Sequence, residues 1–350
     1  MISRGFSNLR ITCDKTIYRQ LRASSLISGL LTTRAESPNL HSAPCRTDSQ
    51  ISAGRWRRIG QATFLVLGGS EVRMKNTPAP HPKYALGHSD EELERLNRQA
   101  QLFEPFTRQL FQQAGVTSGM RVLDVGCGSG DVAFLAADLV GPSGEVIGAD
   151  RAAAAVDRAL ARAHSINARN VTFLEGDPAE LQFDRPFDAV VGRLVLMYYP
   201  DPVDAVRKLA GHLRDGGLVV FQEFDLANCR SLPPAPTFER QAGWVKQALS
   251  ATGARTQLGL ELYSVFQAAG LPGPSMRMDA LIGGGPDSQA CELVADVTRS
   301  LLPMMEQLKI ATSAEIDLSS LAERMRDEVV ASKGVVLSPG LIGAWSRKLR

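Results

Sequence analysis

The sequence predicts an α/β protein with a doubly wound, mostly parallel, seven-stranded sheet and helical cover insertions near the C-terminus. From Met120 onward, short apolar runs alternate with helical stretches of about 10–15 residues, which is the spacing of βαβ units and hence of a parallel sheet. The chain has 350 residues, of which 44% are apolar, and this is enough for a substantial hydrophobic core.

Residues 1–73 form a basic leader with eleven Lys or Arg and four Asp or Glu, which leaves 28 basic and 33 acidic residues, a net charge of −5, for residues 74–350. Three interpretations stay open. The leader is a mitochondrial transit peptide with a basic amphipathic helix at 18–31, a disordered tail, or sequence upstream of a true start at Met74. If the leader is a transit peptide, we expect the protein to be located in the mitochondrial matrix. Under the other two interpretations we expect a cytoplasmic protein.

Composition excludes several classes of function. The acidic balance of residues 74–350 argues against a broad phosphate-binding surface, so we expect no nucleic-acid partner. No apolar run approaches the ~18 residues of a membrane span. The five cysteines are scattered without C-x-x-C spacing, which indicates neither a disulfide framework nor a metal site and favours a reducing compartment.

An N-terminal helical segment is expected at 74–117. Ser89-Asp-Glu-Glu92 reads as a capping box, which predicts a helix start at Ser89. A second helix is expected at about 104–114, ending at Gly115.

The predicted core spans 118–226. Strands are expected at 121–125, 145–149, 171–174, 187–192 and 218–224, and helices at 131–140, 151–165 and 202–213. Right-handed crossovers between parallel strands place the ligand crevice at the carboxyl ends of the strands, near the first one.

The C-terminal part, 227–350, departs from this rhythm. Helices are expected at 237–250, 258–269, 288–309 and 318–332, and strands at 275–281 and 334–344. We interpret 237–250 and 288–332 as insertions that cover the crevice; the alternative is that they only thicken the core.

The most informative segment is Val122-Leu-Asp-Val-Gly-Cys-Gly-Ser-Gly-Asp131, which follows a predicted strand and opens a predicted helix. A dinucleotide-binding loop reads G-x-G-x-x-G and holds a pyrophosphate at the helix N-terminus. Here Asp131 stands at the position of the third glycine, and Asp124 precedes the loop. Both carboxylates would repel a pyrophosphate, so the loop suits a nucleoside without phosphates.

Two further carboxylates follow the next two strands. Asp150 can accept hydrogen bonds from both hydroxyls of a ribose. Asp177 is placed to accept from an exocyclic adenine amine. Together with a loop that accepts a sulfonium and an ammonium, these groups describe S-adenosylmethionine. Taken singly, the glycines could be turn residues and Asp150 a helix cap.

These residues occur together with Gly148-Ala-Asp150, Glu175-Gly-Asp177, Phe187-Asp-Ala-Val-Val191 and Leu213-Arg-Asp-Gly-Gly217. The set resembles the class I S-adenosylmethionine-dependent methyltransferases over about residues 84–283. Within that family it is similar to the small-molecule and quinone-biosynthesis-type enzymes. The resemblance implies a Rossmann-like fold and S-adenosylmethionine as cofactor.

The resemblance also implies roles for individual residues. Asp124 and the loop glycines would surround the methionine portion, Asp150 would hold the ribose, and Asp177 would meet the adenine. The full expected cofactor-binding set is Asp124, Gly126, Cys127, Gly128, Gly130, Asp150, Arg151, Asp177, Pro178 and Arg193. Pro178 lacks the backbone N–H that the family often uses at this point, and Ala179 is the nearest substitute.

The segment Gly192-Arg-Leu-Val-Leu-Met-Tyr-Tyr-Pro200 bears on the substrate. It lacks the Asn/Asp-Pro-Pro-aromatic motif of amino-methylating enzymes. Its apolar run at 194–197 indicates either a small apolar or aromatic substrate or a helix that packs against the sheet. No catalytic residue is identified, and the candidates are Tyr84, Arg193 and Glu223. Asp225 could share with Glu223 a contact to substrate or to the cofactor's ammonium.

Two alternative functions are a nicotinamide-dependent oxidoreductase and a non-catalytic, cofactor-binding partner subunit. The glycine spacing and the two loop carboxylates disfavour the first, and the intact loop disfavours the second. A homodimer is possible.

Overall fold

The computed structural model describes residues 55–59, 62–67, 70–73, 90–286 and 288–349. The chain divides into two compact units, Met1–Thr77 and Pro78–Arg350. The second unit contains both the predicted core and the predicted C-terminal part.

The described part of the first unit consists of three strands. They are β1 (Arg55–Ile59), β2 (Ala62–Leu67) and β3 (Ser70–Arg73), paired antiparallel in that order. None of the three interpretations of the leader included strands. The leader was interpreted from its basic composition alone. A local hairpin signal in its sequence, the dipeptide Gly68-Gly69 between two β-prone runs, was not used. The predicted helix at 18–31, the proposed start at Met74 and Tyr84 lie outside the described residues.

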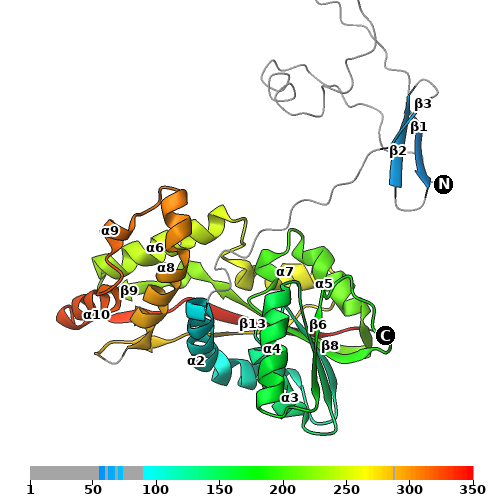
Figure 1. The fold of residues 1–350 in the computed structure, drawn as a ribbon, viewed down its shortest axis with the longest axis horizontal. Coiled ribbons are helices and arrows are strands. Elements are labelled where there is room, and N and C mark those ends of the chain that lie inside the picture. The colour runs from blue at the N-terminus through cyan, green and yellow to red at the C-terminus, as the bar shows by residue number, and fades with distance from the viewer. Residues whose placement is uncertain (1–54, 60–61, 68–69, 74–89, 287, 350) are drawn as a thin grey trace, which may run out of the picture. The chain divides into compact units, whose positions relative to one another are not determined.

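The second unit is built on the predicted seven-stranded sheet (Figure 1). Its strands are β4 (Arg121–Val125), β5 (Glu145–Asp150), β6 (Val171–Glu175), β7 (Phe187–Arg193), β8 (Leu213–Asp225), β10 (Ser275–Asp279) and β13 (Gly340–Arg347). Their order is β10-β13-β8-β7-β4-β5-β6. β13 runs antiparallel to both of its neighbours, and the pairs among β4, β5, β6, β7 and β8 are parallel. The predicted mostly parallel, doubly wound sheet is therefore confirmed.

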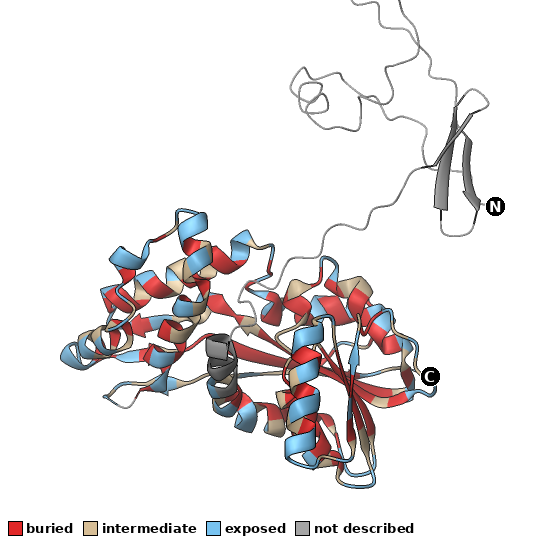
Figure 2. Cartoon of the chain, in the orientation of Figure 1, coloured by how far each residue is buried: buried red, intermediate tan, exposed pale blue. Residues whose placement is uncertain are grey.

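Helices cover both faces of this sheet. The helices are α2 (Asp90–Ala114), α3 (Asp131–Val140) and α4 (Ala153–Ser165) on one face, and α5 (Pro202–Gly211) and α7 (Leu258–Ala268) on the other. Successive side chains of a strand point to opposite faces. On β4, accordingly, Val122 packs in the first layer and Leu123 in the second. Figure 2 shows the sheet as a continuous buried band.

The N-terminal segment differs from the expectation, because one helix, α2, replaces the two that were predicted. α2 passes through Pro105, which removes one backbone hydrogen bond. Fully buried side chains lie on both sides of the proline, Phe103 before it and Leu110 and Phe111 after it. This packing holds the two halves in one helix and outweighs the loss at Pro105.

The C-terminal part adds a helical layer and a small sheet. Its elements are β9 (Arg230–Leu232), α6 (Pro236–Ala251), β11 (Ile282–Gly283), α8 (Gln289–Gln307), α9 (Ser313–Ile316), α10 (Leu321–Ala331) and β12 (Val335–Leu337). The strands pair in the order β11-β12-β9, and the helices share a core of their own around Phe238, Leu301 and Met305. The single last strand expected at 334–344 is divided into β12 and β13. The break falls at Pro339, whose missing N–H cannot join a ladder.

In the part of the chain that the structure describes, no helix combines the length and the apolar content needed to cross a bilayer.

Candidate cofactor and substrate site

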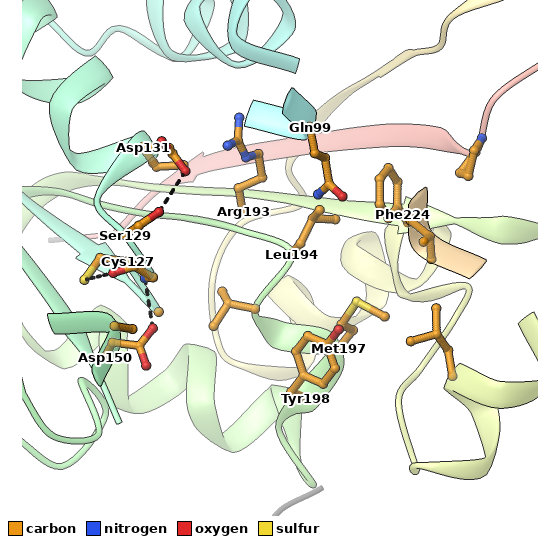
Figure 3. A pocket seen from close by; sticks show the side chains of 18 of the residues that line it. Gln99, Cys127, Ser129, Asp131, Asp150, Arg193, Leu194, Met197, Tyr198 and Phe224 are labelled. Carbon is orange, nitrogen blue, oxygen red and sulfur yellow. Dashed lines mark hydrogen bonds between the residues drawn. The ribbon is translucent and has the colours of Figure 1, made fainter. Parts of the chain in front are cut away.

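A cavity of about 540 Å³ opens at the carboxyl ends of β4, β5 and β7 (Figure 3). This volume lies within the usual range of small-molecule sites, about 300–1,000 Å³. One end is formed by the glycine loop after β4 and by the start of α4. The other end is formed by α6, α8 and the segment that follows β8. The site therefore lies where the crossover topology predicted the crevice.

The glycines of the loop have different tasks. A Cβ on Gly126 would overlap the side chain of Val195, and one on Gly130 would lie 2.9 Å from Phe173 Cζ, so both positions are needed for close packing. Gly128 has φ +54°, and a Cβ there would meet no atom within 4 Å. Gly126 and Gly128 line the cavity, whereas Gly130 does not. Gly128 thus presents bare backbone to open space in which a ligand can lie.

Asp150 lies at the end of β5 on the cavity wall, as predicted. Its Oδ2 accepts a hydrogen bond from Gly128 N (2.9 Å), and its Oδ1 accepts one from Ala152 N (2.9 Å). A carboxylate offers about four acceptor sites, so each oxygen retains capacity for a ribose hydroxyl. The helix-cap and ribose roles considered for Asp150 are therefore compatible.

Asp177 does not line the cavity, in contrast to the expectation that it meets the adenine. Its Oδ1 accepts from Ala179 N (3.0 Å) and from the Tyr199 hydroxyl (2.9 Å), and its Oδ2 pairs with Arg151 Nη2 (2.7 Å). Burial alone would raise the pKa of Asp177, but these hydrogen bonds and the Arg151 charge lower it.

The wall in front of Asp177 consists of Arg151, Pro178 and Tyr199. The Arg151 guanidinium lies 4.4 Å from the centre of the Tyr199 ring. Asp177 therefore orients this wall. The N–H of Ala179, which was expected to face the cofactor, donates its hydrogen bond to Asp177 instead. The sequence analysis did not identify Tyr199, the second residue of the Tyr198-Tyr199 pair after the fourth strand, as a residue of this wall.

Asp124 also lies beneath the wall and not on it. It is 1% exposed, and in the described part neither carboxyl oxygen has a hydrogen-bond partner of good geometry. Burial raises its pKa well above the usual range, and the Arg193 charge and the Ala133 N–H offset this only in part. Cys127 lines the cavity, and burial followed by the charges of Asp124 and Asp150 raises the pKa of its thiol, which stays protonated.

Glu223 and Asp225, which were expected to contact the substrate or the cofactor's ammonium, form hydrogen bonds inside the protein instead. Glu223 is fully buried and outside the cavity wall, and its Oε1 accepts from Val195 N (3.0 Å) and Leu196 N (2.7 Å). Burial raises the pKa of Glu223 to about 7. Asp225 accepts from Ala227 N (3.0 Å) and from the Asn228 amide. Each carboxylate satisfies backbone N–H groups of a turn that follows a strand, which sequence spacing did not reveal.

Arg193, at the tip of β7, does line the cavity, as predicted. The next residue, Leu194, has φ +56°, a left-handed conformation that is unfavourable for a leucine. The hydrogen bonds to Glu223 hold the residues that follow this turn, and Leu194, Val195 and Met197 face the cavity. Glu223 is thus a positioning residue.

The interpretation of the C-terminal insertions is correct in part. α6 contributes Ala242, Val245 and Leu249 to the cavity wall, and α8 contributes Leu293, Val294 and Val297. α9 and α10 do not line the cavity. α10 instead packs behind α6 and α8 and so thickens the core.

Comparison with known proteins identifies the family. Residues 116–270 match a family model described as a methyltransferase domain. Over 153 residues the chain is 33% identical to the aklanonic acid methyltransferase DauC of Streptomyces sp. (strain C5), a match that covers 43% of this chain and 69% of the relative. The chain belongs to the S-adenosylmethionine-dependent methyltransferases.

Other relatives match over shorter regions. The demethylmenaquinone methyltransferase of Staphylococcus aureus is 32% identical over 134 residues, which covers 38% of this chain and 52% of that enzyme. The chain thus spans about half the length of this relative. The solved structure of the YcgJ protein from Bacillus subtilis aligns with 70% of this chain and 99% of its own, at 20% identity and a TM-score of 0.47.

The predictions of a methyltransferase and of S-adenosylmethionine as cofactor are thereby confirmed, and the oxidoreductase and non-catalytic alternatives are set aside. The residues present fit this cofactor, because Gly128 leaves room beside the backbone and Asp150 retains acceptor capacity at the wall. When bound, the cofactor supplies a methyl group activated by a sulfonium. Gly126, Gly128 and Asp150 are the residues that would hold it.

Proposed function

We propose that this methyltransferase acts on a small apolar or aromatic molecule and not on a nucleic acid or protein. The observation that carries the proposal is the composition of the cavity beyond the glycine loop. Its side chains are predominantly apolar and come from α6, α8, the end of β8 and the segments after β7 and β8. They include Leu194, Met197, Phe224, Leu226, Val245, Leu249, Leu293, Val294 and Val297.

Such a wall suits methyl transfer for a physical reason. The reaction is an in-line displacement at carbon that discharges the sulfonium, so alignment of the acceptor and exclusion of water are the main contributions of the protein. α6 and α8 supply both, because they place apolar surface opposite the glycine loop. The names of the two sequence relatives describe enzymes that act on aklanonic acid and on demethylmenaquinone, which supports a small-molecule acceptor.

Transfer of radiolabelled methyl from S-adenosylmethionine to a panel of apolar aromatic acceptors tests the proposal. Val297→Asp places a carboxylate on the apolar wall, and burying an unpaired charge is unfavourable. We expect KM for an accepted aromatic compound to rise at least about 10-fold, with the affinity for S-adenosylhomocysteine unchanged.

Val330→Asp is the matched control, since Val330 is 44% exposed on α10, away from the cavity. Equal activity of the Val297 and Val330 variants toward apolar acceptors would contradict the proposal. Transfer to polar acceptors alone would do the same.

A further inference from the structure

We infer that Arg193 binds an anionic group of the acceptor, so that the substrate is an apolar or aromatic molecule carrying a carboxylate or a similarly placed oxyanion. This inference rests on the proposed function and makes the substrate class more specific.

The position of Arg193 fits this role. Figure 3 shows it between the loop residues Ser129 and Asp131 and the apolar residues Leu194 and Phe224. It therefore lies where the part of the cavity assigned to the cofactor meets the part assigned to the substrate. A group bound there would lie at the loop-facing end of the acceptor.

The guanidinium has unused hydrogen-bonding capacity. Its Nη1 donates to Thr107 Oγ1 (3.1 Å), and the Thr107 hydroxyl lies 2.7 Å from Gln222 Oε1, to which it donates. Thr107 and Gln222 are both fully buried, so they fix this arrangement. Arginine has five N–H donors, and among the described residues Thr107 is the hydrogen-bond partner of Arg193.

Among the side chains that the structure describes, no carboxylate forms an ion pair with Arg193. Three acids exert an electrostatic effect on it: Asp131, Asp124 and Glu104. Asp131 is paired with Arg162 (2.7 Å), and Glu104 is paired with Arg108 (2.9 Å). Asp124 is 1% exposed beneath the cavity wall, and among the described residues neither of its carboxyl oxygens forms a hydrogen bond with Arg193.

A partly buried cation without a dedicated counter-ion is costly, and burial accordingly lowers the pKa of Arg193. A carboxylate presented to the free donors of a guanidinium would offset this cost through charge-assisted hydrogen bonds. With its acid group at Arg193, a substrate would extend its apolar body toward Phe224 and the helices α6 and α8.

A carboxylate could also come from the cofactor, whose methionine portion carries one. The experiment therefore separates the two sources. The full chain is saturated with S-adenosylhomocysteine, and calorimetry measures the binding of three aromatic acids of rising size, benzoate, 2-naphthoate and anthracene-9-carboxylate. The neutral carboxamide of each acid is the matched probe. The same titrations are made with Arg193→Met and with Arg193→Lys.

We expect the best-fitting acid to bind the wild type at least about 10-fold more tightly than its amide, since a hydrogen bond to a charged group contributes about 1.5–3 kcal/mol. Arg193→Met should abolish this preference, and Arg193→Lys should keep part of it because the charge remains. The affinity for S-adenosylhomocysteine should be the same in all three proteins, which also shows that the variants are folded.

Equal binding of acids and amides by the wild type, or a preference that persists in Arg193→Met, would overturn the inference while leaving the proposed function in place. A loss of S-adenosylhomocysteine affinity in Arg193→Met that is absent with its decarboxylated analogue would assign Arg193 to the cofactor instead. If neither acids nor amides bind, the proposed function fails and the inference falls with it.

Discussion

Glu223 supports the segment that forms the middle of the cavity, and its replacement gives a sharp test of this arrangement. Its side chain is fully buried, and one oxygen accepts hydrogen bonds from Val195 N and Leu196 N. The other oxygen has no partner in the described part of the chain. Glu223→Ala removes the acceptor and leaves two N–H groups unsatisfied. Glu223→Gln keeps an acceptor oxygen at the same position.

The expected magnitudes follow from these contacts. Each unsatisfied buried donor costs about 1–3 kcal/mol, so Glu223→Ala should lower the free energy of unfolding at pH 5 by about 3–5 kcal/mol. Glu223→Gln should cost less than about 1 kcal/mol at the same pH, because the wild-type carboxyl is then also largely neutral.

The pH dependence has a definite sign. The pKa of Glu223 is raised from 4.5 to about 7 in the folded state, so the folded protein holds the proton more tightly than the unfolded chain. The resulting stabilisation is fully present below pH 4.5 and is lost as the pH rises through 7. It amounts to about 3 kcal/mol. Glu223→Gln lacks this contribution and should gain stability relative to the wild type by about 2–3 kcal/mol between pH 5 and 8.

Urea unfolding of the wild type and both variants at pH 5, 6, 7 and 8 measures these differences. If the stability difference between wild type and Glu223→Gln stays constant over this range, Glu223 is ionised throughout and the reasoning is refuted. If Glu223→Ala is as stable as Glu223→Gln at pH 5, the hydrogen bonds to the Val195 segment are not its main role.

Three further perturbations test other parts of the structure. Gly128→Val places a branched side chain at a positive φ and in the open space where the cofactor is expected to lie. Calorimetry should therefore show an affinity for S-adenosylhomocysteine at least about 100-fold weaker than in the wild type. Unchanged binding would show that the cofactor does not approach this backbone. Arg151→Ala removes the ion pair with Asp177 and the contact with Tyr199. Because the Arg151 side chain is about one-third exposed, the free energy of unfolding, measured by thermal unfolding, should fall by less than about 1 kcal/mol. A larger decrease would mean that this wall stabilises the fold. Leu301→Ala removes a fully buried side chain of α8 and should lower the free energy of unfolding in urea by about 2–5 kcal/mol. A decrease below about 1 kcal/mol would contradict the burial of Leu301.

The sheet could be predicted because its strands are buried apolar runs separated by helices of regular length. The glycine loop and Asp150 were predictable for a related reason, since both lie where a parallel strand ends and a helix begins. Their positions follow from local sequence and from the handedness of the crossovers.

Other features depend on tertiary contacts that spacing does not encode. α2 continues through Pro105 because residues far along the chain pack on both of its halves. Asp177 lies behind the wall because Arg151 and Tyr199, from two other segments, meet at its carboxylate. Glu223, proposed as a base from its place after a strand, satisfies backbone donors of a neighbouring turn instead.

If the glycine loop and Asp150 hold S-adenosylmethionine, direct titration of this cofactor should show it. Calorimetry of the full chain should show saturable binding of S-adenosylmethionine and no binding of NADH. Asp150→Ala removes the acceptor for Gly128 N, and if Asp150 also binds the ribose, the substitution should weaken cofactor binding at least about 10-fold. Equally tight binding of S-adenosylmethionine by Asp150→Ala would show that Asp150 does not hold the cofactor, and no binding by the wild type would exclude this site altogether.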